Sequence, residues 1–497
     1  MAKKYIAAID QGTTGTTVSL VGEEGRVIAK HNEEYPQIFP QPGWVEHNPS
    51  DIWRSVVTSM TKAMEKGSVS GNEIVAIGIT NQRETVLLWD KKTSDPVYNA
   101  VVWQCRRTSD FCNTLKKKKL EKKIYSKTGL VIDAYFSASK IHWLLENVNG
   151  AKKRAKNGEL AAGNIDTFLI WKLTGGKSHR TDFSNASRTM LMSLDKCTWD
   201  KDMMKIFSVP GEVLPEICAS DEIFGYTRGL SFLPDGIPIS GVAGDQQAAL
   251  FGQTCFSAGE AKCTFGTGSF LLMNTGTKPK VSKHKLLTTV AWKLKRDRNV
   301  TYALEGGAFI CGAAVQWLRD GLGLVHKASE MEGLAGSVAD TGGVEFVPAL
   351  TGLGAPHWNQ EARGIICGLT RGTTKAHLAR ATLEAMALQN TEILISMQRD
   401  LGKSLKSLRV DGGAAVNNLL MQTQADYLGV KIERPEIIET TSAGAAYLAG
   451  LGIGFWKDLN QIKTVWRVER EFVSEMSAKS RRERLNRWQT AISRAIL

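Results

Sequence analysis

Long apolar runs are missing from this sequence, and their absence excludes a membrane-spanning protein. No window approaches the roughly 20 apolar residues that a transmembrane helix needs, and the longest candidate, residues 445–456, is short and broken by glycine. The N-terminus reaches Asp10 after five apolar residues, too few for the core of a signal peptide. We therefore expect a cytoplasmic protein with no membrane insertion.

Cysteine and proline are also sparse. The eight cysteines include no C-x-x-C pair and no framework of short spacings, which argues against a structural zinc site or disulfides. With 13 prolines among 497 residues, 42% hydrophobic and 23% charged residues, the chain has a globular composition throughout. At about 100 to 200 residues per domain, its length predicts two to four domains.

Positive charge exceeds negative charge by 13, which could indicate an anionic partner. The basic residues gather in two stretches with helical spacing: Lys116 to Lys119 with Lys122 and Lys123, and Arg481, Arg482, Arg484 and Arg487. Aromatic residues do not alternate with these basic residues, as the binding of single-stranded nucleic acid would require. We expect solvated helix faces and no nucleic-acid partner.

The first residues predict a strand, a turn and a hairpin. Residues 4–9 form an apolar strand that ends in the sequence Asp-Gln-Gly-Thr-Thr-Gly at 10–15, and residues 18–21 and 26–30 follow as two further strands. The turn joins antiparallel strands, and it lacks the lysine and the following helix of a Walker loop.

The rest of the chain alternates strands and helices, which favours an α/β architecture. Ser50 is expected to cap a helix that ends at Gly67, and strands are expected at 74–80, 85–89 and 101–103. The second half repeats the strand, turn and return strand at 261–265, 266–269 and 270–274; helices near 309–322 and 377–401, a strand at 408–410 and a helix from about 417 follow. The order of elements predicts two similarly built lobes that meet around residues 245–260.

Three glycine-rich turns follow strands, at 10–15, 266–269 and 411–414. Glycine lets backbone N–H groups approach a phosphate, threonine hydroxyls add donors, and a carboxylate at a strand end can hold Mg²⁺ through water. Each motif alone is typical of any tight turn. Their occurrence in both halves indicates a nucleotide bound between two lobes.

Two further positions allow a structural and a functional interpretation. Arg83 and Glu84 lie between two apolar runs, either as a surface ion pair in a hairpin or as a pair that binds vicinal hydroxyls. Asp245 follows an apolar run, either as a helix N-cap or as a site carboxylate at a strand end. Trp103 alone is typical of a core residue.

Taken together, these motifs resemble the FGGY carbohydrate kinases over nearly the whole chain. The matching segments are IDQGTT at 9–14, PGWVEHNP at 42–49, ITNQRET at 79–85, DAYFSASK at 133–140, NASRTML at 185–191, GDQQAALFGQ at 244–253, FGTGSF at 265–270, TGLGAP at 351–356, RVDGGAAVNN at 409–418 and TSAGAAYLAGL at 441–451. The resemblance implies a two-lobed actin/hexokinase-like (ribonuclease H-like) fold, with the active site in the cleft between an N-terminal lobe at 1–250 and a C-terminal lobe at 251–497. It also implies ATP-dependent phosphorylation of glycerol to sn-glycerol 3-phosphate with Mg²⁺, in glycerol uptake and catabolism.

The resemblance also assigns roles to residues. The residues implied to bind the polyol are Arg83, Glu84, Trp103, Tyr135, Asp245, Gln246 and Phe270, with Trp103 and Phe270 as apolar walls and Asp245 also as the general base. The residues implied to bind the nucleotide are Thr13, Thr14, Gly15, Thr267, Gly312, Gln316, Gly413 and Asn417, while Asp10 and Asp245 would hold Mg²⁺ through water. We expect a homodimer or homotetramer.

Two departures from the family pattern stand out. Thr17 occupies the place of an arginine that contacts the nucleotide phosphates in relatives, and Lys262 is the candidate cation to replace it. The segment 228–236 lacks both the basic loop that binds fructose 1,6-bisphosphate and the phosphorylated histidine of some relatives, so we expect neither mode of regulation.

Other functions remain open from the sequence. A kinase for xylulose, ribulose or gluconate would share the fold and the nucleotide turns, as would a pseudokinase or a chaperone-type ATPase. A chaperone would add a peptide-binding domain, for which the roughly 45 residues after the last motif are too few.

Overall fold

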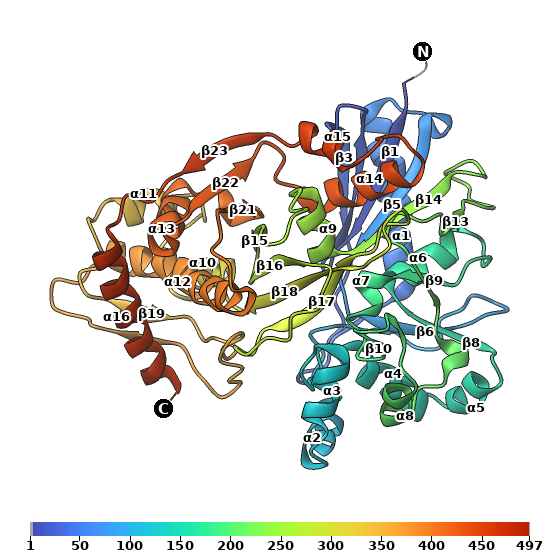
Figure 1. Cartoon of the computed structure of the whole chain (residues 1–497), viewed down its shortest axis with the longest axis horizontal. Coiled ribbons are helices and arrows are strands. Elements are labelled where there is room, and N and C mark those ends of the chain that lie inside the picture. The colour runs from blue at the N-terminus through green and yellow to red at the C-terminus, as the bar shows by residue number, and fades with distance from the viewer. Residues whose placement is uncertain (1–2, 497) are drawn as a thin grey trace.

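The computed structural model describes residues 3–496, which form two lobes side by side, each built around one large sheet (Figure 1). The first sheet has six strands in the order β13-β14-β5-β1-β2-β3, with β1 Tyr5–Gln11, β2 Gly15–Val21, β3 Val27–Glu34, β5 Ile74–Asn81, β13 Gly225–Tyr226 and β14 Pro238–Gly244. The second has seven in the order β17-β18-β16-β15-β21-β22-β23, with β15 Ala261–Phe265, β16 Ser269–Gly276, β17 Leu287–Trp292, β18 Thr301–Ala308, β21 Ser407–Asp411, β22 Lys431–Pro435 and β23 Val468–Phe472. We call these the first and second sheet.

The two sheets share one pattern of strand pairing. In the first sheet, β1 pairs with β2 and β2 with β3 in antiparallel fashion, while β5 and β14 continue the sheet in parallel. In the second sheet, β15, β16 and β18 repeat the antiparallel part, and β21 and β22 repeat the parallel part. An antiparallel edge strand, β13 or β23, closes each series. The predicted similarity of the two lobes is therefore present in the pairing of the strands.

Helices and smaller sheets surround these two layers. The first lobe also contains a four-stranded sheet of β4 Glu46–His47, β7 Ala100–Val101, β6 Val86–Asp90 and β8 Leu160–Asn164, and the helices α1 Pro49–Gly67, α2 Ser109–Lys117, α3 Glu121–Thr128, α4 Ser137–Asn147, α5 Ala151–Lys156, α6 Ile165–Leu173, α7 Phe183–Ala186 and α8 Lys201–Phe207. The remaining helices are α9 Asp245–Gly252, α10 Gly312–Gln316, α11 Glu330–Gly336, α12 Lys375–Leu401, α13 Asn418–Leu428, α14 Thr440–Gly452, α15 Leu459–Val465 and α16 Ala478–Ile496. Two-stranded pairs join β9 Arg180–Asp182 to β12 Glu216–Cys218, β10 Met192–Ser193 to β11 Thr198–Trp199, and β19 Glu345–Val347 to β20 Ile365–Cys367.

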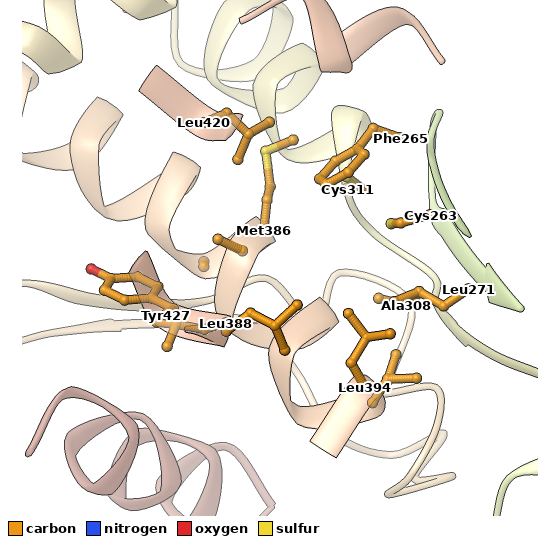
Figure 2. Packing of buried hydrophobic residues seen from close by; sticks show 14 of the residues in the cluster. Cys263, Phe265, Leu271, Ala308, Cys311, Met386, Leu388, Leu394, Leu420 and Tyr427 are labelled. Carbon is orange, nitrogen blue, oxygen red and sulfur yellow. The ribbon is translucent and has the colours of Figure 1, made fainter. Parts of the chain in front are cut away.

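A large apolar core lies between the second sheet and the long helix α12. Figure 2 shows Met386, Leu388 and Leu394 of this helix in one cluster with Leu271 and Ala308 of the sheet, where Leu394 lies beside Ala308. These side chains are at most 4% exposed. Because fully burying one such side chain contributes about 1.5 to 3 kcal/mol, this core fixes the second sheet as a rigid support for the loops at its edge.

Helices α9 and α14 pack against each other between the two lobes. Although α14 comes late in the chain, it lies against β1, β5 and β14 of the first sheet, as its colour and place in Figure 1 show. A Cβ atom at Gly444 would lie 1.8 Å from the carbonyl oxygen of Ala248, and one at Gly252 would lie 2.0 Å from that of Thr440. The two helices therefore cross at backbone contact distance, which only glycine permits at these positions.

Three local expectations were wrong. Helix α1 is capped by Asn48 and not by Ser50: Pro49 takes the first helical position, and the N–H of Ser50 donates to Asn48 Oδ1 over 2.9 Å. The runs on either side of Arg83 do not form a hairpin, because β5 and β6 belong to different sheets. Arg484 is buried, with its guanidinium bonded to Glu345 and Glu384, and is not part of a solvated face.

Candidate active site

The first glycine-rich turn follows β1, which ends at Gln11, and enters β2 at Gly15. The Oγ1 atom of Thr13 accepts a hydrogen bond from the indole N–H of Trp103 over 2.9 Å, and the Gln37 amide donates to the Thr13 carbonyl over 2.9 Å. Thr14 is exposed, whereas Gly15 is buried. This turn is therefore fixed by the first lobe and joined directly to one of the predicted apolar walls.

Arg83 and Glu84 follow β5 and are buried, with exposures of 3% and 1%. The Nε atom of Arg83 lies 3.1 Å from Asp245 Oδ1, so residues from two separate strand ends meet. Glu84 has a φ of +61°, a left-handed conformation that side chains other than glycine rarely adopt and that often marks functional sites. Burial excludes the surface ion pair and places both side chains beside Asp245.

Trp103 and Tyr135 form an aromatic corner beside this pair. Their rings meet edge to face with centroids 5.6 Å apart. Lys140 is fully buried and donates to the carbonyl groups of Ala134, over 3.0 Å, and Phe136, over 2.8 Å, on either side of Tyr135. Burial lowers the pKa of Lys140 to about 8. The lysine thus fixes the loop that carries Tyr135, and sequence reasoning missed this role.

Asp245 begins α9 directly after β14, and its side chain is 30% exposed. Burial raises its pKa, while Arg83 and Lys262 act in the opposite direction. The neighbouring Gln246 accepts a hydrogen bond from the Nζ atom of Lys262, a buried residue of β15 that also donates to the Thr264 hydroxyl over 2.7 Å. Lys262 therefore reaches the site, with its ammonium group bonded to protein oxygens.

Asp10 lies at the end of β1, near Asp245. Burial and the charge of Asp245 raise its pKa to about 7, and the Ser442 hydroxyl is its hydrogen-bond donor, at 3.4 Å. In the register of the first sheet, Thr17 is the partner of Asp10, and its hydroxyl donates to Asn32 Oδ1 over 3.1 Å. Carboxylate oxygens are the ligand type that Mg²⁺ prefers, and of these two carboxylates Asp245 is already paired with Arg83.

The turns of the second lobe lie next to one another. The N–H of Gly312 donates to the carbonyl of Gly266 over 2.9 Å, and the N–H of Ala313 to that of Thr267 over 3.0 Å. A Cβ atom at Gly412 would lie 2.7 Å from the Phe265 carbonyl oxygen, which brings the third turn against the same strand end. These contacts bring the turns that carry Thr267, Gly312 and Gly413 together.

Other predicted nucleotide residues have different surroundings. Gln316 is exposed on α10, and the side chain of Asn417 caps α13 by accepting from the N–H of Leu420 over 2.9 Å. Within residues 3–496, no hydrogen bond joins Thr13 or Thr14 to Thr267. The predicted nucleotide residues therefore form one group in each lobe.

Phe270 and Glu305 project from one face of the second sheet, since Phe270 pairs with Gly307 and Leu272 with Glu305 across β16 and β18. Glu305 binds both Arg83 and Arg188. Sequence reasoning gave no role to Glu305 or Arg188. The segment NASRTML contained Arg188, but nothing local marked it as a partner of residues 104 and 117 positions away.

No helix within residues 3–496 combines the length and the apolar character needed to cross a membrane.

Comparison with known proteins adds to this geometry. Residues 5–252 match the N-terminal domain of the FGGY family of carbohydrate kinases, and residues 261–453 match its C-terminal domain. The chain is 64% identical over 490 residues to a glycerol kinase of Bdellovibrio bacteriovorus, with 99% of each chain covered. It is 52% identical over 496 residues to a glycerol kinase of Pseudothermotoga lettingae, with 100% of this chain and 99% of the relative covered.

Solved structures give the same picture of the fold. A Plasmodium falciparum glycerol kinase with ADP superposes with a TM-score of 0.93 at 39% identity, over 100% of this chain and 99% of that one. A ligand-bound xylulose kinase from Lactobacillus acidophilus superposes with a TM-score of 0.86 at 21% identity, over 99% and 97% of the chains, and shows the fold alone. With both of its domains matched and the two-lobed actin/hexokinase-like fold present, the chain belongs to the FGGY family of carbohydrate kinases.

Proposed function

We propose that this protein transfers the γ-phosphoryl group of ATP to glycerol and forms sn-glycerol 3-phosphate. The observation that carries the proposal is the group formed by Arg83, Glu84 and Asp245 beside the rings of Trp103 and Tyr135. Full-length identity of 52% to 64% with relatives named glycerol kinase supports it. A small triol suits such a site, because buried polar groups are left unpaired by a substrate without the matching hydroxyls.

Asp245 is the general base of this proposal. Its carboxylate accepts the proton of the attacking hydroxyl while the hydroxyl oxygen bonds to the γ-phosphorus and ADP departs. The raised pKa of Asp245 suits this role, since a base works best when its pKa approaches the working pH. Arg83, at 3.1 Å, orients the carboxylate.

Asp10 and Asp245 are the residues we propose to hold Mg²⁺ through water. When bound, the ion neutralises charge on the phosphates. Thr13, Thr14, Gly15, Thr267, Gly312, Gln316, Gly413 and Asn417 are proposed to bind the nucleotide from both lobes, and Gln246 and Phe270 to complete the polyol site.

The biological setting is a further part of the proposal. Phosphorylation gives glycerol a charge that is costly to bring into an apolar bilayer, so a cytoplasmic enzyme would retain glycerol as it enters and commit it to catabolism. We also propose a lobe boundary near residue 250. We further propose that the protein is a homodimer or homotetramer, and light scattering of the purified protein would test this oligomeric state.

An ATP-coupled assay with glycerol, dihydroxyacetone, xylulose, ribulose and gluconate tests the substrate. We expect kcat/KM for glycerol to exceed that for each five- or six-carbon compound by at least about tenfold, because the loss of matched hydroxyl contacts is costly. A preference of similar size for a five-carbon ketose would refute the proposal.

A further inference from the structure

Four charged side chains are buried together where the two lobes meet. Arg83 and Glu84 follow β5, Arg188 lies after α7, and Glu305 is on β18 of the second sheet; none is more than 3% exposed. Two positive and two negative charges balance within the group. Buried charges are tolerated only when they are paired, so the arrangement of each depends on the others.

Glu305 fixes the guanidinium group of Arg83. Its Oε2 atom accepts from Arg83 Nη1 over 2.6 Å, and its Oε1 atom accepts from Arg83 Nη2 over 3.0 Å. Gln247 accepts a third bond from Nη1 over 3.2 Å. An arginine has five N–H donors, so Nε–H and one Nη2–H remain for Asp245 and a substrate hydroxyl. The carboxylate of Glu305 therefore sets the direction in which Arg83 presents these two donors.

Arg188 fixes the orientation of the Glu84 carboxylate. Its Nε atom donates to Glu84 Oε1 over 2.6 Å, and its Nη2 atom donates to Glu305 Oε1 over 3.0 Å. The guanidinium carbon of Arg188 lies 5.8 Å from the ring centroid of Tyr135. Within the described part of the chain no donor besides Arg188 bonds the Glu84 carboxylate, which leaves its Oε2 atom for a hydroxyl.

We infer that Glu305 and Arg188 are positioning residues that hold the polyol-binding pair Arg83 and Glu84 in its working orientation. Glu305 belongs to the second lobe and Arg83 to the first, 222 positions apart in the chain. The polyol-binding groups of one lobe are thus assembled only when the sheet of the other is in place. The inference rests on the proposed function in taking a polyol as the bound substrate.

The variant Glu305→Gln tests this inference, because it keeps the size of the side chain and removes its charge. We expect KM for glycerol to rise at least about tenfold and KM for ATP to change less than about twofold, since only the polyol contacts lose their orientation. Glu305→Asp keeps the negative charge, and KM for glycerol of this variant should stay within about threefold of the wild-type value. Arg188→Lys keeps the positive charge but loses the planar guanidinium group that donates to both Glu84 and Glu305. It should therefore also raise KM for glycerol more than KM for ATP.

Glu345→Gln is the matched control. Glu345 is 8% exposed and accepts two hydrogen bonds from Arg484, over 2.9 and 2.8 Å, within the second lobe. Loss of its charge should lower the melting temperature, as for Glu305→Gln, without a change in KM for glycerol. The inference is wrong if Glu305→Gln and Arg188→Lys change KM for glycerol less than threefold, or if they raise KM for glycerol and KM for ATP equally. It is also wrong if their KM for glycerol equals that of the control Glu345→Gln.

The wild-type substrate panel separates the two proposals. If the wild type prefers another polyol, glycerol phosphorylation is refuted, and the same variants are measured with the preferred polyol. Selective loss of affinity for that polyol would still support the positioning role, and its absence would overturn it. If Glu305→Gln does not fold, Arg188→Lys and Glu305→Asp supply the same comparison.

Discussion

At the scale of single residues, the site contains buried charged side chains, and the pKa of each depends on the charge of its neighbours. Arg83 binds Glu305 and Gln247 while its Nε atom faces Asp245, and Lys262 lowers the pKa that burial raises at Asp245. Asp10 shares this environment, with a pKa of about 7. A substitution that alters one of these charges is therefore expected to affect the neighbouring charged groups as well.

Asp245→Asn should keep the fold and the affinity for ATP but lower kcat by about 10²- to 10⁴-fold, because the amide cannot accept the hydroxyl proton. Steady-state kinetics, with circular dichroism as a control for folding, measure this. A variant that retains more than a tenth of the wild-type kcat would exclude Asp245 as the base.

If no other cation compensates for the missing arginine, Thr17→Arg should raise kcat/KM for ATP by about ten- to a hundredfold and strengthen ADP binding accordingly. Thr17 is the strand partner of Asp10, so a cation there would lie beside the first turn, where a charge-assisted bond to a phosphate contributes about 1.5 to 3 kcal/mol. Calorimetric titration with ADP measures the effect. Unchanged or weaker binding would mean that the site compensates for the missing arginine, with Lys262, whose ammonium group reaches the site, as the candidate cation.

At the scale of secondary-structure elements, the carboxyl and guanidinium groups of the candidate site lie at strand ends and helix N-termini. Asp10 lies near the end of β1, Arg83 and Asp245 follow β5 and β14 of the same sheet, and Asp166 is the second residue of α6 in the same lobe. Burial raises the pKa of Asp166 to about 7, although Thr181 donates to its carboxylate over 2.6 Å. This carboxyl is therefore costly to ionise in the folded protein.

The stability of the protein should fall, relative to Asp166→Asn, as the pH rises from 5 to 8. The folded-state pKa is above the unfolded value, so folding favours the protonated form and this contribution is lost as the pH passes through about 7. The difference in unfolding free energy between wild type and variant should change by on the order of 2 to 3 kcal/mol. Urea titrations at both pH values test this, and a difference independent of pH would contradict it.

Gly444→Ala should destabilise the protein by at least about 2 kcal/mol, because the added Cβ would lie 1.8 Å from the Ala248 carbonyl oxygen and force α9 and α14 apart. Gly333→Ala is the control: Gly333 lies in α11 with no atom within 4 Å of the added Cβ, and alanine there should stabilise by about 0.5 to 1 kcal/mol. Equal melting temperatures for the two variants would disprove the close crossing.

The sequence predicted those parts of the fold and site that local patterns encode. The strand, turn and return strand at 261–274 are found in β15 and β16, and the turns at Asp10 and Gly266 lie at the predicted strand ends. Even a local pattern failed at Ser50, where Asn48 two residues earlier is the cap. Glu305 and Arg188 could not be predicted, because their partners are more than 100 positions away and are chosen by packing.

At the scale of the whole molecule, the two lobes are not independent segments of chain. Helix α14 covers β1, β5 and β14 of the first sheet, and its buried Ala445 and Tyr447 belong to one apolar cluster with Ile6 and Ala8 of β1. Residues 440–452 therefore complete the core of a lobe whose sheet is formed by residues before 245.

Residues 1–252 expressed alone should not fold cooperatively, because the face of the first sheet that α14 covers would be exposed to water. We expect strong binding of an apolar dye and no sigmoidal urea transition. Fusing residues 436–466 to this fragment through a long Gly/Ser linker should reduce dye binding. A fragment that unfolds cooperatively without them would show that α14 is dispensable for the lobe.

The late position of α14 has a consequence for how the protein is made. After residue 252 has been added to the chain, about 200 residues must still be synthesised before α14 is complete, which takes roughly 10 to 40 s at about 5 to 20 residues per second. Throughout that interval an apolar face of the first sheet stays uncovered on the nascent chain. The cell must therefore protect a half-finished lobe from aggregation, and slow translation between residues 252 and 452 would lengthen its exposure.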